Sequence, residues 1–215
     1  FFNPLSSVKD RIGLAMIADG IQRGGIRFDF LSAGSSAGAL QHDPADALDA
    51  WAAQNGIRRM VRTGIALYGY SPLRAAVDAE TGLRPVLAWK TRVVSLRTIE
   101  PGTAVGYDAT FTAHRRTRLA LLPVGYGDGL NRLLSNRGSV LVRGQRAPIA
   151  GRISMDHTVV DVTEIPGVDR GDEVVLIGEQ DAERITADEL ASITGTIAYE
   201  VLCAISARVP RVMVD

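Results

Sequence analysis

The sequence is poor in cysteine and in lysine, and both shortages limit what the protein can be. Cys203 is the single cysteine in 215 residues, which excludes an internal disulfide bond and a metal site built from several cysteines. A single thiol also fits a reducing compartment, so we expect a cytoplasmic protein. Lysine occurs only at Lys9 and Lys90.

Charge of one sign and long apolar runs are absent as well. Lys+Arg and Asp+Glu number 24 each, so no net field favours nucleic acid or an anionic membrane. No apolar stretch approaches the ~20 residues of a membrane span, and the first residues lack the order of a signal peptide. We therefore expect no nucleic-acid partner and no membrane partner. Because residue 1 is Phe and not Met, we expect the chain to be a fragment or a processed product.

The first third of the chain predicts helices, loops and little strand. Apolar residues recur at helical spacing over 7–22, which predicts an amphipathic helix. A short apolar piece at 28–31 leads into a run of small residues at 32–39, typical of a loop that lets backbone approach a ligand. Residues 43–56 predict a second helix, and residues 58–70 predict a strand that ends in a glycine turn.

The character of the sequence changes at about residue 83. Short runs rich in Val, Ile, Leu and Thr then alternate with turn signals, which predicts a β-domain. One helix is expected at 186–194, where Thr186 and Glu189 have the spacing of a capping box. The last segment, 199–214, predicts a return to strand. The expected fold class is therefore mainly β, with an α/β piece before the β-domain.

Two tyrosines follow glycines at the expected ends of strands. Tyr107 lies in "VGYDATFTA" and Tyr126 in "PVGYGDG", and the glycines let each ring project from its strand. A phenol has an ordinary pKa near 10, so it carries protons in catalysis only where cations or donors stabilise its anion. The alternative is that both are boundary aromatics without a chemical role.

Three other features are ambiguous by themselves. Arg62 interrupts an apolar strand pattern, so it either binds an anion or a ring nitrogen beside Gly64 or forms a salt bridge between helix and strand. Arg152 and Asp156 flank Met155, as in a turn between strands with a surface ion pair. The three histidines are too scattered to predict a metal site, and we assign no metal.

Together and in this order, these segments resemble alanine racemase. The resemblance covers residues 31–215 and rests on "SAGSSAGAL", "MVRTGIALYGY", "VGYDATFTA", "LPVGYGDG", "APIAGRISMDHTVVDV" and "AYEVLCAISARVPRV". It implies pyridoxal 5'-phosphate at the mouth of a (β/α)8 barrel, a C-terminal β-domain, and a homodimer whose subunits share each active site. The implied function is the two-base interconversion of L-alanine and D-alanine, which supplies D-alanine for peptidoglycan.

The resemblance also assigns roles to particular residues. Tyr107 matches the tyrosine that exchanges a proton with the substrate Cα, and Arg62 matches the arginine that faces the pyridine nitrogen. Where the family usually has an asparagine before the phosphate-binding serine, this chain has Ser35. The remaining matches hold the cofactor phosphate, at Ser36, Gly64, Ile65 and Tyr199, or surround the substrate, at Tyr126, Met155 and Asp156.

Residues 1–26 do not continue that resemblance. The family's cofactor lysine, in a motif like "VVKANAYG", is absent together with most of the barrel. The segment instead resembles the cofactor-lysine segment of cysteine synthase, in which Lys9 of "SVKDR" forms the Schiff base. We thus expect a lysine segment (1–26), a barrel remnant (27–80) and a β-domain (81–215). A non-catalytic dimerising β-domain and a cysteine synthase-type β-replacement enzyme are the alternatives to a racemase.

Overall fold

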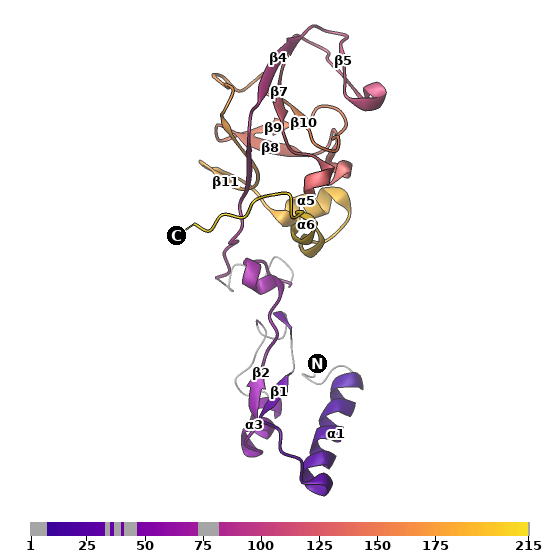
Figure 1. Ribbon diagram of the computed structural model, residues 1–215, viewed down its shortest axis with the longest axis vertical. Coiled ribbons are helices and arrows are strands. Elements are labelled where there is room, and N and C mark those ends of the chain that lie inside the picture. Colours follow the sequence, from indigo (N-terminus) through magenta and orange to yellow (C-terminus); the bar gives the residue numbers. More distant parts are fainter. Residues whose placement is uncertain (1–7, 33–34, 37–39, 41–46, 73–81, 215) are drawn as a thin grey trace. The chain divides into compact units, whose positions relative to one another are not determined.

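The computed structural model describes residues 8–32, 35–36, 40, 47–72 and 82–214. The chain divides into two compact units, Phe1–Val86 and Leu87–Asp215 (Figure 1). Within the described ranges, no helix has both the length and the apolar character needed to cross a bilayer.

The first unit pairs two short parallel strands beside two helices. Leu31 of β1 lies opposite Arg59 of β2. Leu31, Ala52 and Ile57 form a small buried cluster, and apolar side chains of α1 pack against it. The elements are α1 (Val8–Gly24), β1 (Phe30–Ser32), α3 (Ala47–Gln54), β2 (Arg58–Met60) and the 3-10 helix η1 (Ile65–Tyr68).

The helix predicted over 7–22 is confirmed by α1, and α3 lies within the second predicted helix. The small-residue loop at 32–39 and the start of that second helix lie largely outside the described residues. The strand predicted over 58–70 is wrong beyond Met60. Because β1 is only three residues long, β2 has a parallel partner over three residues, and the chain then turns into η1.

The second unit is built from antiparallel strands, as the sequence predicts. Among its described residues, β10, β7 and β4 form one sheet, and β12, β11, β8 and β9 form another in which β3 also pairs with β11. A small hairpin, β5–β6, projects from them (Figure 1). The bounds are β3 (Trp89–Arg92), β4 (Ser95–Ile99), β5 (Ala104–Val105), β6 (Phe111–Thr112), β7 (Thr117–Leu122), β8 (Ser139–Val142), β9 (Gln145–Pro148), β10 (Thr158–Asp161), β11 (Glu173–Gln180) and β12 (Glu183–Ile185).

The two sheets share one apolar core. Leu122 and Val160 from the first sheet belong to the same buried cluster as Leu141 and Val175 from the second. A bridge between Ile149 and Val160 joins the end of β9 to β10, so the sheets are also linked through the backbone. This shared core is the rigid base from which the loops of the second unit extend.

Two helices lie together at one end of the second unit, α5 (Ala187–Thr194) and α6 (Ala198–Ala204) (Figure 1). The Thr186 side chain accepts a hydrogen bond from the Glu189 N–H at 3.1 Å, as predicted for the start of α5. The strand predicted over 199–214 is wrong, because its first residues belong to α6. Ala198 and Leu202 are both buried, and a spacing of four places them on one face of a helix.

An arginine ties α5 to the sheet. The Arg146 guanidinium in β9 donates to Glu189 at 2.6 Å, to Glu183 at 2.8 Å and to the Arg184 carbonyl at 2.7 Å. The carboxylates, that of Glu189 first and that of Glu183 second, raise the pKa of Arg146 above its ordinary value. The Glu189 carboxylate thus binds Arg146 rather than completing the capping box.

Two adjacent leucines test where the core ends. Leu134 is 2% exposed within the core cluster, whereas Leu133, in the same 3-10 helix η4 (Arg132–Leu134), is 57% exposed. We expect Leu134→Ala to lower the free energy of unfolding by about 2–5 kcal/mol, because it leaves a cavity. Leu133→Ala is the matched control, with an expected change within about 0.5 kcal/mol. Urea denaturation of both variants measures the difference, and equal losses would contradict the packing described.

Candidate functional site

The predicted residues of the second unit lie on surface loops. Tyr107 begins η2 (Tyr107–Ala109), Tyr126 begins η3 (Tyr126–Asp128), and Met155 lies in the loop before β10. The exposed fractions are 71% for Tyr107, 44% for Tyr126 and 52% for Met155. Both phenols therefore project from the sheets, as expected from the glycine before each of them.

The loop that carries Tyr107 is strained. Asp108 and Ala109 have φ angles of 60° and 50°, so two consecutive residues with side chains occupy the left-handed region. Each such residue costs about 1–3 kcal/mol and persists only where its surroundings hold it. Gly106, just before Tyr107, has a φ of 76°, and a Cβ there would lie 3.1 Å from the main-chain nitrogen of Arg152.

Two side chains hold this strained loop against its neighbour. Arg152 Nε lies 2.8 Å from Asp108 Oδ2 in an ion pair whose geometry is not that of a hydrogen bond. The Asn136 amide donates to the Thr110 carbonyl at 3.3 Å, and its oxygen accepts the Gly151 N–H at 2.6 Å. The strained loop is therefore tied to the segment that leads to Met155.

A second pair of loops meets through the backbone. The Tyr126 N–H donates to the Ser154 carbonyl at 3.0 Å, and the Gly127 N–H donates to the Met155 carbonyl at 2.9 Å. A Cβ at Gly125 would lie 2.2 Å from the Ser154 oxygen and 2.4 Å from the Met155 oxygen. The two loops approach so closely only because residue 125 has no side chain.

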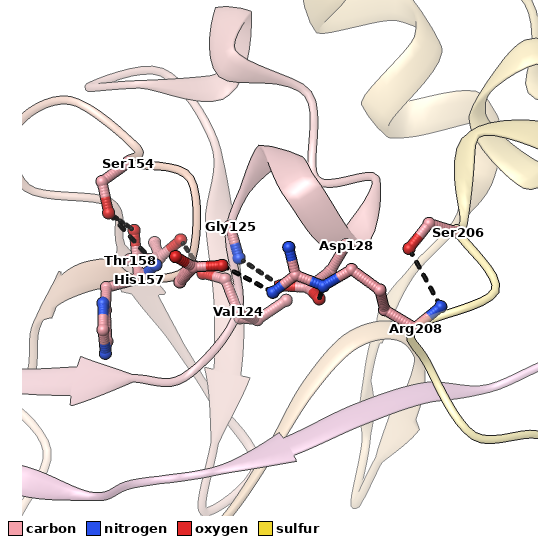
Figure 2. A network of polar contacts seen from close by, with 9 residues as sticks. Val124, Gly125, Asp128, Ser154, His157, Thr158, Ser206 and Arg208 are labelled. Carbon is pink, nitrogen blue, oxygen red and sulfur yellow. Dashed lines mark hydrogen bonds and ion pairs between the residues drawn. The ribbon is translucent and has the colours of Figure 1, made fainter.

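Charged groups close this junction, as Figure 2 shows. Asp128, which is 9% exposed, accepts the Gly125 N–H at 2.9 Å through Oδ2. Arg208 lies between two carboxylates, with Nε 3.4 Å from Asp128 Oδ1 and Nη2 2.5 Å from Asp156 Oδ1. Its hydrogen bond to Asp156, followed by the charge of Asp128, raises the pKa of Arg208 above its ordinary value.

The predicted ion pair between Arg152 and Asp156 is wrong. Arg152 pairs with Asp108 and Asp156 pairs with Arg208, so each partner lies far away in the sequence. Sequence reasoning also missed Asp128 and Arg208 themselves. The only local signal for Asp128 was its position three residues after Gly125, the spacing at which an acidic side chain can cap the start of a helical turn.

In the first unit, a buried hydroxyl lies at the start of η1. Ser36, which is 3% exposed, accepts the Gly64 N–H at 2.8 Å and the Ala66 N–H at 3.2 Å. Ile65 is buried beside them, at 5% exposed. A Cβ at Gly64 would meet nothing within 4 Å. The main-chain N–H groups of this turn thus face a hydroxyl, with open space alongside.

Arg62 is exposed and lies after the end of β2, not within a strand. Its guanidinium donates to the Ser32 hydroxyl. The ion pair between helix and strand is formed instead by Arg59 and Asp49, at 2.5 Å.

Tyr199, Lys90 and Lys9 complete the set of candidates. Tyr199 is in α6 and is 40% exposed. Lys90 Nζ donates to Glu173 at 3.0 Å across the β3–β11 pair. Lys9 is the second residue of α1, and its side chain lies outside the described residues, as does His42. Within the described ranges, no group of three or more His, Cys, Asp or Glu side chains is arranged to hold a metal ion.

Comparison with known proteins identifies the class to which this architecture belongs. Residues 86–213 match the family described as "Alanine racemase, C-terminal domain". The chain therefore belongs to the alanine racemase family, and the mainly β fold expected from its sequence is confirmed.

Particular relatives agree with that family. The chain is 54% identical over 152 residues to the alanine racemase of Halothermothrix orenii, and 50% identical over 155 residues to alanine racemase 2 of Caldanaerobacter subterraneus. These matches cover 71% and 72% of this chain but 40% of each relative. The chain thus spans less than half the length of these curated relatives.

Solved structures extend the similarity along the chain. The alanine racemase of Bacillus anthracis with bound L-Ala-P superposes with a TM-score of 0.80 and 31% identity, over 96% of this chain and 50% of that one. That of Streptomyces lavendulae superposes with a TM-score of 0.78 and 32% identity, over 99% of this chain and 54% of that one. Such matches are too long to leave out all of residues 1–26, so part of α1 superposes on a racemase. The resemblance of residues 1–26 to cysteine synthase stays a prediction.

The contact at Gly125 gives a direct test of this junction. Gly125 has ordinary extended backbone (φ −150°, ψ −163°), so Gly125→Ala adds only the clash with the Met155 loop. We expect the loops to separate, with about 1–3 kcal/mol of lost stability and faster hydrogen exchange at the Tyr126 and Gly127 amides. Gly171→Ala is the control. Its φ of 95° makes a side chain there strained, but its Cβ would meet nothing within 4 Å, so this variant has backbone strain without a clash between loops. Unchanged exchange at both amides in Gly125→Ala would show that the loops are not in contact.

Proposed function

We propose that this chain carries the tyrosine half of a pyridoxal 5'-phosphate-dependent alanine racemase, with Tyr107 as the residue that exchanges a proton at the Cα of alanine. The observation that carries the proposal is the surface position of Tyr107 on a strained loop that Arg152 ties in place. Strain of this kind gathers at functional sites. Membership of the racemase family and relatives at about 50% identity support the same assignment.

The first unit fits the phosphate end of the cofactor. Hydroxyl and main-chain N–H groups of one turn can bind phosphate groups, and we assign Ser36, Gly64 and Ile65 to this role because they lie in one turn, where the Gly64 N–H donates to the Ser36 hydroxyl and a Cβ at Gly64 would meet open space. Arg62 is assigned to the pyridine nitrogen, where a permanent positive charge disfavours protonation of that nitrogen. Tyr199 is a further phosphate ligand by family resemblance. When bound, the cofactor supplies an electron sink for the negative charge that develops at Cα.

The loops of the second unit hold the substrate. Tyr126 and Met155 lie on the two loops that meet through the backbone, and we assign them to the alanine carboxylate. By family resemblance, we assign Asp156 to the entrance of the active site. The Tyr107 side chain accepts the Cα proton on one face as a phenolate, and the phenol that this forms returns a proton to that face in the opposite direction of the reaction.

A racemase also needs a base on the opposite face of the substrate, and Lys9 is our candidate. Lys90 has a carboxylate partner in the sheet, Glu173, which leaves its amine less available for an aldehyde. Lys9 lies in the first turn of α1, where the helix dipole disfavours its charged form. A neutral amine is the form that attacks an aldehyde.

The partner is a second racemase chain, as in a homodimer with shared active sites. Met155 and Ile197 are 52% and 60% exposed in the second unit, in addition to the exposed tyrosines. Exposed apolar side chains of this size favour burial against another subunit. The tyrosine half of a site also requires a cofactor-bearing barrel opposite it.

Lysine labelling tests the role of Lys9. We expect incubation with pyridoxal 5'-phosphate and reduction with borohydride to leave a pyridoxyl group on Lys9, located by peptide mass spectrometry. Lys9→Arg should lose the label, whereas the matched variant Lys90→Arg should keep it, because only the amine at position 9 is proposed to capture the aldehyde. A label on Lys90 alone, or on neither residue, contradicts the proposed role of Lys9.

Complementation tests the role of Tyr107. The chain is mixed with an intact alanine racemase whose own catalytic tyrosine has been replaced by phenylalanine, and exchange of the alanine Cα hydrogen with deuterium is measured. We expect exchange to return, and Tyr107→Phe in this chain to reduce it by about 100- to 10,000-fold, the usual contribution of a positioned acid or base.

Two outcomes would count against this proposal. Restored exchange that Tyr107→Phe leaves unaltered removes Tyr107 from the mechanism. A mixed dimer that forms without any exchange favours the non-catalytic dimerising domain. Size-exclusion chromatography of the mixture distinguishes this case from a failure to associate.

A further inference from the structure

We propose that Arg208 is a positioning residue for Tyr126 and Met155, because its guanidinium binds one carboxylate from each of the two loops that carry them. The inference rests on the proposed function, in which these loops hold the substrate carboxylate. Arg208 itself comes from neither loop but from the C-terminal segment after α6. It therefore sets the separation of two elements that it does not belong to.

Arg208 contacts both loops directly. Nη2 is 2.5 Å from Asp156, the neighbour of Met155, and Nε is 3.4 Å from Asp128, two residues after Tyr126 (Figure 2). Both contacts use one planar group, so the distance between the two carboxylates is fixed by the shape of the guanidinium.

Asp128 also binds main-chain groups of two segments, so the position of its carboxylate affects the backbone of both. Its Oδ2 accepts the Gly125 N–H at 2.9 Å, and its carbonyl accepts the Ser206 N–H at 2.9 Å. Asp128 is 9% exposed, and its hydrogen bond from the Gly125 N–H satisfies part of the buried carboxylate with or without Arg208. Loss of Arg208 removes the one cation that pairs with Asp128 in the described part of the junction.

Arg208 also packs directly on the Tyr126 loop. A Cβ at Gly127 would lie 2.5 Å from Arg208 Nη1 and 3.0 Å from the Met155 oxygen. The guanidinium thus lies against the backbone of Gly127, whose N–H bonds to the Met155 loop. A lysine at this position has one compact ammonium and cannot reproduce both the two carboxylate contacts and this packing.

Exposure separates this positioning role from general stabilisation. The Arg208 side chain is 52% exposed, and ion pairs at such positions contribute about 0–1 kcal/mol to folding. Its removal should therefore loosen the two loops while the sheets keep their stability.

The test compares Arg208→Gln and Arg208→Lys with the unaltered chain. Hydrogen exchange at the Tyr126 and Gly127 amides is followed by NMR, together with the thermal midpoint of unfolding. We expect exchange at both amides to become about tenfold faster in Arg208→Gln and to be intermediate in Arg208→Lys, with little change in the thermal midpoint.

Arg211→Gln is the matched control. Arg211 lies in the same C-terminal segment, but its guanidinium bonds to the carbonyls of Ile205, Ser206 and Val209 and to neither loop. If Arg211→Gln speeds exchange at Tyr126 and Gly127 as much as Arg208→Gln does, the segment and not the charge holds the loops. That result, unchanged exchange in Arg208→Gln, or faster exchange spread evenly over the second unit, overturns the proposal.

An activity measurement keeps this inference distinct from the racemase proposal. In the complementation mixture, Arg208→Gln should raise the KM for alanine more than it lowers kcat, because the loops are proposed to grip the substrate carboxylate. Absence of activity with the unaltered chain would refute the racemase role alone, and the exchange rates would still decide whether Arg208 positions the loops. A fall in kcat at constant KM, with the loops intact by exchange, overturns the positioning role.

Discussion

The close contact between the Tyr126 loop and the Met155 loop is the constraint on which the candidate site depends. Two main-chain hydrogen bonds join these loops, and the clash that any Cβ at residue 125 would cause shows how little space separates them. Both loops are proposed to hold one substrate carboxylate, so a shift of about 1 Å between them would lower the rate of the proposed reaction. Gly125 is therefore required because the two loops leave no room for a side chain, and not because its backbone conformation needs glycine.

The sheet beneath the loops explains why they meet. The Tyr126 loop leaves the end of β7 and the Met155 loop enters β10, and Leu122 lies opposite Thr158 in the ladder that pairs these strands. The buried Thr158 hydroxyl also donates to the Val124 carbonyl at 2.7 Å, just before the loop begins. Two segments about thirty residues apart in sequence thus start from adjacent, hydrogen-bonded backbone. A rigid scaffold with functional loops at its edge follows from this pairing.

The sequence allowed the prediction of elements whose signals are local. The alternating Val and Ile runs gave the strands of the second unit, and the glycine before Tyr107 and before Tyr126 gave their exposed positions. Pairings between distant charges could not be predicted, because nothing in the sequence around a carboxylate such as Asp108 indicates which arginine lies next to it in the fold. Helix α6 was missed for another reason. In "AYEVLCAI" apolar residues satisfy both the two-residue and the four-residue spacing, and so short a run does not distinguish strand from helix.

Guanidinium–carboxylate pairs hold both parts of the candidate site in the second unit, Arg152 with Asp108 near Tyr107 and Arg208 with Asp128 and Asp156 near Tyr126. An arginine stays charged through the whole range in which a phenol or an amine exchanges protons, and Asp156 raises the pKa of Arg208 further. Lysine or histidine in these places would bring groups that titrate within or near that range. These ion pairs can therefore keep one geometry over the pH range in which a phenol or an amine changes its charge, which is what the proposed proton exchange at Tyr107 requires of its surroundings.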